Sequence, residues 1–247
     1  MRIVVLADVH GNSLALDAVT EQVVFAEADE VVFLGDAVAN GFDPRGALDR
    51  LRALDPHLVM GNTDADILDP PAFYRDRQQF EPETRRVLEI SLWCHEQLTD
   101  EDRAFIATFQ PTIELELPGD RRLVGFHGSP KSPTDVITAE TSETTLVDLL
   151  GHGDVFTGGH THVPLLRAVG PRRFVNPGSV GLPFVQYGTA GHVPLLPVAH
   201  YAVIEASQYA LDISFHAVPL DLDGLRDQAL HSGMPHAGWW ASQWPGA

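Results

Sequence analysis

Apolar residues near the N-terminus occur in short runs that alternate with segments of helical spacing. The first run, Ile3 to Ala7, is followed by apolar residues spaced as on one face of a helix, which predicts a strand and then a helix to about Ala26. The same unit recurs along the chain, with strands predicted at 31–34 and 57–60 and a helix at 44–54. Alternating strands and helices of this kind predict a largely parallel sheet.

The alternation stops between about residues 65 and 110. Helical spacing covers 81–98, and Thr99 with Asp102 forms the pattern of a capping box that starts a second helix through Phe109. We expect this segment to be a helical insert beside the tip of the third strand. It could be peripheral or could cover a substrate, and the sequence leaves both interpretations open.

The second half of the chain is richer in strands. Two segments, 112–117 and 122–126, flank the turn at Pro118 to Asp120 and predict a β-hairpin. Further elements are a helix at 143–150, strands at 154–157 and 173–175, and a final hairpin at 200–205 and 210–218. The tail from about Gly233 is rich in Gly, Pro, His and Trp and gives no clear element. With no internal repeat or linker, we expect a single domain over residues 1–247.

Composition narrows the function classes. The 247 residues carry a net charge of −18, which disfavours general binding to nucleic acid or to an anionic membrane. One cysteine, Cys94, allows no internal disulfide, and its place in a helical apolar pattern argues against thiol chemistry. The apolar N-terminal run is too short for a signal peptide, and no run reaches a membrane span, so we expect a cytoplasmic protein.

Polar residues with metal-binding side chains follow five of the predicted strands, each close to a glycine. Because the carboxyl ends of strands in an open α/β sheet gather at one edge, these side chains are expected to meet there. The set offers two carboxylates, one amide oxygen and four imidazoles, which suits Mn²⁺, Fe or Zn²⁺ better than Ca²⁺. The candidate ligands are Asp8, His10, Asp36, Asn62, His127, His160 and His162.

The ordered motifs Asp-x-His, Gly-Asp, Gly-Asn, Gly-x-His and Gly-His-x-His, with Asn-Pro-Gly-Ser at 176–179, resemble those of the calcineurin-like metallophosphoesterase superfamily. They are most similar to its small bacterial and archaeal phosphodiesterase branch. The resemblance covers roughly residues 2 to 205 and implies a four-layer α/β/β/α sandwich. It also implies two divalent metal ions, with Mn²⁺ foremost and Zn²⁺ or Fe as alternatives, and a metal-bridging hydroxide as the nucleophile.

The resemblance assigns roles by position. Asp8, His10 and His162 would hold the first metal ion, Asn62, His127 and His160 the second, and Asp36 would bridge them. Asp36, Asn62 and His127 would serve catalysis directly. Substrate contacts are expected from Thr63 and from Asn12, although Asn12 is first a helix cap. Asp64 would support the ligands from behind, as would the backbone carbonyls of Gly159 or Thr161.

Two departures from the family pattern affect the expected chemistry. Many members have a histidine after the Asn, where it protonates the leaving oxygen, and this chain has Thr63 instead. Losing such an acid favours substrates with good leaving groups. The branch often carries Gln-Pro-Arg after the Ser, whereas this chain reads Gly181-Leu182-Pro183-Phe184. We therefore expect a more apolar pocket, lined by the insert and by Leu182 to Pro197.

Three functions are compatible with these residues. The leading hypothesis is a dinuclear metal-dependent phosphodiesterase acting on a small phosphoester. The alternative is a binding or scaffold protein that keeps the fold and has lost catalysis, which Thr63 favours and the intact ligand set opposes. A nuclease is a third idea, which the net charge of −18 disfavours.

The tryptophans of the tail could stack on bases, but we expect them to dock on the body or on a second subunit, and a homo-oligomer stays open.

Other candidates have simpler explanations. Ser179 lacks the strand, turn and helix context of a nucleophile, and a role in its own turn is expected. Eight histidines lie away from the strand tips and are expected to be structural or solvated: His57, His95, His152, His192, His200, His216, His231 and His236.

Overall fold

Two five-stranded sheets form the centre of the computed structural model, which describes residues 1–188 and 194–246. The first sheet has the order β10-β9-β1-β2-β3, in which β1, β2 and β3 are parallel and β9 and β10 add an antiparallel edge. Its strands are β1 (Arg2–Leu6), β2 (Glu30–Phe33), β3 (His57–Leu58), β9 (Val198–Ala206) and β10 (Leu211–Pro219).

The second sheet has the order β4-β5-β6-β8-β7. Strands β5, β6 and β8 are parallel at its centre, and β4 and β7 are antiparallel at its two edges. Its strands are β4 (Thr112–Leu117), β5 (Arg121–Phe126), β6 (Val155–Thr157), β7 (Leu165–Val169) and β8 (Arg172–Asn176).

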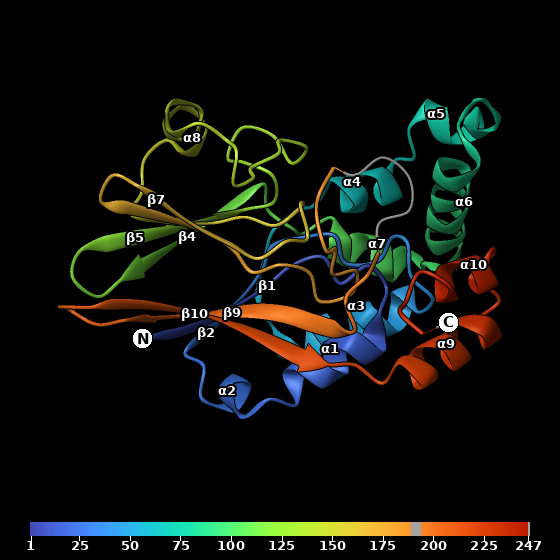
Figure 1. Cartoon of the computed structure of the whole chain (residues 1–247), viewed down its shortest axis with the longest axis horizontal. Coiled ribbons are helices and arrows are strands. Elements are labelled where there is room, and N and C mark those ends of the chain that lie inside the picture. The colour runs from blue at the N-terminus through green and yellow to red at the C-terminus, as the bar shows by residue number, and fades with distance from the viewer. Residues whose placement is uncertain (189–193, 247) are drawn as a thin grey trace.

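The side-chain alternation along β1 shows why the sheets stack. Val4 and Leu6 pack in the cluster that contains α1 (Ser13–Thr20) and α3 (Pro44–Leu54), on the outer face of the first sheet. Ile3 and Val5 point the other way and pack against residues of the second sheet. Helix α8 (Glu143–Leu150) covers the outer face of the second sheet, through a third cluster. Figure 1 shows this order of helix, sheet, sheet and helix, which confirms the predicted α/β/β/α sandwich.

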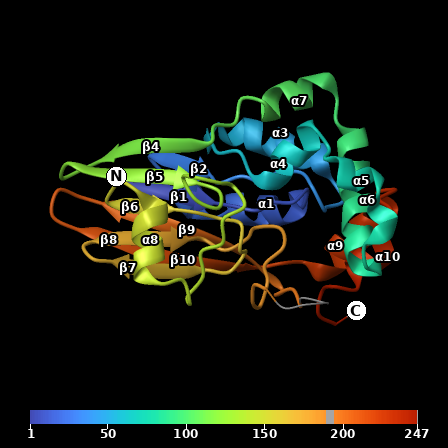
Figure 2. The ribbon, with the colours of Figure 1, turned by 90° about the horizontal axis from the view of Figure 1, so that it is seen from above.

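The helices of the insert and of the C-terminal segment lie together at one end of the sheets (Figures 1 and 2). Those of the insert are α4 (Asn62–Leu68), α5 (Ala72–Arg75), a short 3₁₀ turn η1 (Arg77–Gln79), α6 (Pro82–Gln97) and α7 (Asp100–Ile106). The C-terminal segment adds α9 (Leu222–His231) and α10 (Ala237–Ala241), and α10 lies beside α6. Within the described residues, no helix is both long and apolar enough to cross a membrane.

Several element boundaries differ from the sequence predictions. The helix expected to run to Ala26 is two helices, α1 and α2 (Val23–Ala26), and between them the Gln22 side-chain amide donates to the carbonyl of Ala18 at 2.9 Å. The strand predicted at 57–60 is only two residues long, with Val59 bridging to Gln110 instead. Strand β7 and helices α4, α9 and α10 were not predicted.

Candidate metal centre and substrate pocket

The predicted ligand residues come together at the carboxyl ends of the strands. Five of them have a left-handed backbone, with φ of 57° at Asp8, 48° at His10, 61° at Asp36, 68° at His160 and 59° at His162. Such a conformation costs a residue with a side chain about 1–3 kcal/mol and is concentrated at functional sites. The surrounding hydrogen bonds therefore hold these tips in a shape that the residues alone would not adopt.

Those hydrogen bonds link one strand tip to the next. The amide of Asp8 donates to the carbonyl of Gly35 at 3.0 Å, and that of His10 donates to the carbonyl of Asp36 at 2.9 Å. In the second sheet, the amide of Gly159 donates to the carbonyl of His127 at 2.8 Å. The tips therefore form one connected layer and fix the positions of their side chains relative to one another.

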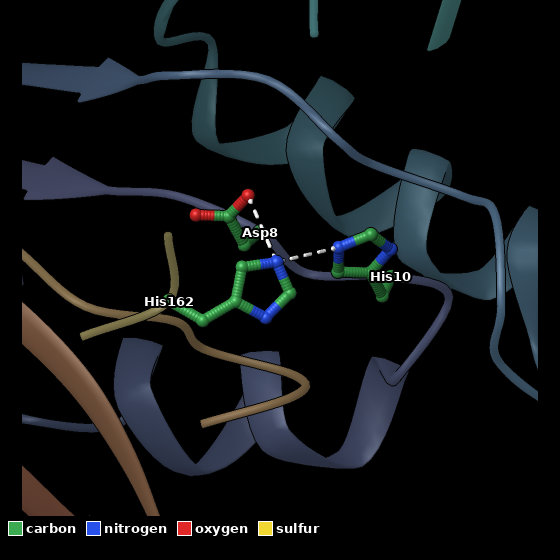
Figure 3. A group of neighbouring side chains, drawn as sticks. All are labelled: Asp8, His10 and His162. Atoms are coloured by element: carbon green, nitrogen blue, oxygen red, sulfur yellow. Dashed lines mark hydrogen bonds and ion pairs between the residues drawn. The ribbon is translucent and has the colours of Figure 1, made fainter. Parts of the chain in front are cut away.

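One group of side chains consists of Asp8, His10 and His162 (Figure 3). The Nδ1 atoms of the two imidazoles lie 2.8 Å from the carbonyl of Ala39 and 2.6 Å from that of Leu182, which makes Nδ1 the protonated nitrogen. The two Nε2 atoms then face each other at 3.1 Å, and that of His162 lies 3.4 Å from Asp8 Oδ1. Burial lowers the pKa of both imidazoles, which favours the neutral form that can bind a metal ion.

This first group fits a cation. Two nitrogen lone pairs and a carboxylate oxygen point at the same space, which is unfavourable unless something positive separates them. Asp8 Oδ1 is buried and accepts no hydrogen bond from the residues that the structure describes. An orphaned buried carboxylate oxygen is costly, and a metal ion satisfies it.

A second group lies beside the first and consists of Asp36, Asn62 and His127. Nε2 of His127 lies 3.0 Å from Asn62 Oδ1 and 3.4 Å from Asp36 Oδ2, and its Nδ1 lies 2.7 Å from the carbonyl of Leu34. Burial opposes the charged form of both Asp36 and His127, but their mutual attraction outweighs it, lowering the pKa of Asp36 and raising that of His127 to about 10. Asp36 also lies 3.6 Å from Nε2 of His10, so it touches both groups.

His160, which follows β6, lies beside both groups, near Asp8 and His127. The His160 amide donates to Asp8 Oδ2 at 3.2 Å, and its ring lies 5.2 Å from that of His127, measured between centroids. The carbonyls that support the other imidazoles belong to Ala39, Leu34 and Leu182, so the expectation of Gly159 or Thr161 in this role was wrong. The Gly159 carbonyl instead accepts from the side chain of Asn176 at 2.7 Å.

Asp64 and Thr63 hold Asp36 in place. The buried carboxylate of Asp64 accepts hydrogen bonds from the amides of Asp36, Ala37 and Gly61 at 2.7, 2.8 and 3.1 Å. Burial and the neighbouring Asp36 raise the pKa of Asp64 to about 7. The amide of Thr63 donates to Asp36 Oδ1 at 2.9 Å. Asp64 therefore lies behind the ligands, as expected.

A pocket of about 450 Å³ opens over these residues. Its floor includes His10, Asp36, Asn62, Thr63, His160 and His162. Its walls come from α6 and from the stretch after Ser179, as expected, although residues 189–193 of that stretch lie outside the described part. Helix α10 also lines it, with Trp239 and Trp240, and the sequence did not reveal this because nothing marks the tail as part of a site.

Asn12 is the helix cap that the sequence predicts. It is fully buried, its side-chain oxygen accepts from the amide of Ala15 at 3.1 Å, and its nitrogen donates to the carbonyl of Gly181 at 3.1 Å. Both polar groups of the side chain bind within the protein, which confirms the helix-capping role, and the substrate contact of Asn12 stays a prediction.

The other expectations concern structural residues. Ser179 stays within its turn, donating to the carbonyl of Asp8 and accepting from the amide of Leu182, each at 2.8 Å. Cys94 is buried, and burial raises its pKa to about 12, which disfavours the thiolate form. Trp240 and Trp244 are buried in the main core, so the tail docks on the body.

The histidines expected to be structural lie outside both ligand groups where they are described, and His192 lies outside the described residues.

Comparison with known proteins identifies the class that this fold and site define. Residues 1–196 match the calcineurin-like phosphoesterase superfamily domain, and the chain belongs to this family. Membership supports a metal-dependent phosphoesterase, in agreement with the two ligand groups.

The chain is similar to particular members. A metallophosphoesterase from Sphaerobacter thermophilus has 25% sequence identity and a TM-score of 0.72, with 98% of each chain covered. Hypothetical protein PH1004 from Pyrococcus horikoshii OT3 shares the fold, with a TM-score of 0.77, 21% identity and coverage of 95% of this chain and 94% of that one. Uncharacterized protein MJ0912 from Methanocaldococcus jannaschii is 24% identical over 196 residues, which are 73% of this chain and 76% of that protein.

Proposed function

We propose that this protein is a phosphodiesterase that binds two divalent metal ions, with Mn²⁺ foremost and Zn²⁺ or Fe as alternatives. The observation that carries the proposal is the first ligand group, where two Nε2 lone pairs 3.1 Å apart converge with an unsatisfied carboxylate oxygen of Asp8. Asp36 then connects this group to Asn62 and His127. We expect a cytoplasmic enzyme with a small phosphoester as its substrate.

The ligand roles follow from these contacts. Asp8, His10 and His162 would hold one metal ion, Asn62, His127 and His160 the other, and Asp36 would contribute to both. When bound, two divalent cations neutralise phosphate charge and activate a water molecule for attack on phosphorus. The protein keeps its ligand atoms ready for them, because Asp64 and Thr63 fix Asp36 and the backbone carbonyls fix the imidazole nitrogens.

Two features of the pocket favour a diester with a good leaving group. A histidine at position 63 would protonate the leaving oxygen, and a threonine hydroxyl cannot do so near neutral pH. Thr63 Oγ1 is also buried and has no hydrogen-bond partner among the described residues, so nothing there prepares the hydroxyl to donate a proton. None of the described residues lining the pocket is Lys or Arg, which disfavours the second negative charge of a monoester.

The proposal predicts that metal-loaded protein hydrolyses bis(p-nitrophenyl) phosphate. Asp36→Asn and His127→Ala should each reduce kcat/KM by at least about 100-fold, because each removes a ligand group from the buried centre. Metal content by elemental mass spectrometry should fall in the same variants. Asp223→Asn is a matched control, because this carboxylate is 99% exposed on α9. Full activity in either ligand variant would contradict the proposal.

The scaffold alternative makes a different prediction. A protein that has lost catalysis would bind both metal ions and still turn over no member of a broad phosphoester panel. Thr63 favours this outcome, and the complete ligand set opposes it. A measurement of bound metal together with turnover separates the two functions.

A further inference from the structure

The outer wall of the pocket is built from two segments that are far apart in the sequence. Helices α6 and α10 lie side by side in both ribbon views (Figures 1 and 2). His236, just before α10, lies 2.5 Å from Glu89 of α6. Trp240 is buried, and its Nε1 donates to the carbonyl of Asn40 at 2.9 Å. The C-terminal segment is therefore anchored on both sides and is a fixed part of the wall.

The surface that this wall offers to a substrate is mostly apolar. Trp239 of α10 and Val87 of α6 line one side, and Leu182 and Phe184 line another. Phe184 stacks on the ring of His162, with the centroids 4.2 Å apart and the planes at 14°. The apolar surface thus begins directly at a metal ligand and continues outward to α10.

Among the described residues, the lining of the wall carries negative charge and includes no Lys or Arg. Glu83 of α6 faces the pocket, and its carboxylate forms no ion pair or hydrogen bond with the described residues. The nearby Arg86 lies over the ring of Trp239, 5.6 Å from its centroid, and is not a lining residue. A second phosphate on a substrate would therefore face the Glu83 carboxylate, and no described Lys or Arg lines the pocket to neutralise it.

On the basis of the proposed function, we propose that the organic group of the substrate is aromatic, carries no further phosphate, and packs against this wall. Trp239 and Glu83 are then the residues that determine specificity. Trp239 supplies a flat apolar surface, and an aromatic contact of this kind adds about 0.5–1.5 kcal/mol beyond its buried area. Glu83 excludes nucleoside polyphosphates and other substrates with several negative charges.

The first test uses binding, so that it does not depend on turnover. Calorimetric titration of metal-loaded protein compares phenylphosphonate with methylphosphonate, which differ only in the group that meets the wall. Trp239→Ala should reduce the preference for the phenyl compound about tenfold, because the ring surface is lost. Tyr209→Ala is the control, since Tyr209 is 91% exposed and lies outside the pocket lining.

The second test concerns charge. Wild-type protein should bind phenylphosphonate more tightly than 4-carboxyphenylphosphonate, and Glu83→Lys should shift this ratio about tenfold toward the carboxylated compound. Glu81→Lys makes the same change of charge two residues away, outside the lining, and should alter the ratio less than about twofold. Glu81 is the N-cap residue of α6 and forms no side-chain cap hydrogen bond, so this control removes no cap contact.

The outcomes separate this inference from the function on which it rests. If bis(p-nitrophenyl) phosphate is hydrolysed and both phosphonates bind, but neither Trp239→Ala nor Glu83→Lys changes the ratios, the inference is wrong and the phosphodiesterase proposal stands. If neither phosphonate binds and bis(p-nitrophenyl) phosphate is not hydrolysed, both are wrong. Altered ratios in the two wall variants, with unchanged ratios in the two controls, support the inference.

Discussion

Each ligand residue at a strand tip depends on a close approach of backbone around it. Gly61 shows this most clearly, because a Cβ atom at that position would lie 2.1 Å from Asp36 Oδ1. Asp36 cannot retreat easily, because the Thr63 amide donates to its Oδ1 and the Asp64 carboxylate accepts from its backbone amide, where φ is 61°. The segment after β3 and the Asp36 carboxylate, which follows β2, therefore fit together only when residue 61 lacks a side chain.

Gly61→Ala is expected to damage the metal centre more than the fold. The added methyl group must displace the Asp36 carboxylate from its place between the two ligand groups, so we predict at least about a tenfold loss in metal affinity, which corresponds to about 1.4 kcal/mol. Metal affinity can be measured by titration against a competing chelator.

Gly170→Ala is the matched control for this prediction. Gly170 has φ of 59° in the turn between β7 and β8, and a Cβ there would meet nothing within 4 Å. This variant should lower the free energy of unfolding by about 1 kcal/mol through backbone strain and leave metal affinity unchanged. If Gly61→Ala binds metal as tightly as Gly170→Ala does, the close approach at Asp36 has no role in the site.

At the scale of elements, Asp102 connects the insert to the body. It completes the predicted capping box of α7, accepting from the Thr99 amide at 3.0 Å, while its own amide donates to Thr99 Oγ1 at 3.2 Å. It also pairs with Arg52 and Arg45 of α3, at 2.8 and 3.2 Å. Burial alone would raise the pKa of Asp102, but the hydrogen bonds from Arg52 and Thr99 outweigh burial and lower it to about 2.

The lowered pKa of Asp102 predicts a pH-dependent contribution to stability. A carboxyl with a folded-state pKa of about 2 stabilises the protein above the pKa of its unfolded state, and this contribution is lost as the pH falls through the folded value. Asp102→Asn should therefore lower the free energy of unfolding by about 2 kcal/mol at pH 7, and the difference from wild type should shrink between about pH 5 and pH 2. Urea denaturation over this pH range measures it.

The control for this prediction is Asp100→Asn in the same first turn of α7. Asp100 is exposed, so its removal should cost only the helix-dipole contribution of about 0.3–1 kcal/mol. A loss in Asp102→Asn that stays constant down to pH 2 would contradict the assignment of the effect to the ionised carboxylate.

Helices and strands with a repeating apolar pattern were predictable, and those defined by tertiary contacts were not. The capping box and α6 are encoded locally, as are the polar residues that follow β1 and β2. Helix α10 is only five residues long and is set by the docking of Trp240 and the contact between His236 and Glu89, which sequence spacing does not reveal. The meeting of the candidate ligands at one edge could be predicted from the sequence, because each follows a predicted strand. The place of Trp239 and Glu83 in the wall could not, because it depends on tertiary contacts.

For the whole molecule, the strongest physical constraint is the net charge of −18, of which two divalent cations would offset only a small part. A phosphodiester anion approaching this surface is repelled at long range, and no described Lys or Arg lines the pocket to counter the repulsion. Attraction begins only close to the metal centre. The rate at which the substrate binds should therefore depend on the ionic strength, which sets the range of the repulsion.

Raising the ionic strength from about 10 mM to 150 mM shortens the Debye length from about 30 Å to about 8 Å, which screens this repulsion. We predict that kcat/KM for bis(p-nitrophenyl) phosphate rises about two- to threefold over this range while kcat changes little, because only the encounter is affected. Glu83→Lys should flatten the dependence, since it removes the acid nearest the substrate path, and the control Glu81→Lys should keep more of it. A fall in kcat/KM with added salt would instead require an attractive field at the mouth of the pocket, which the described lining residues do not supply.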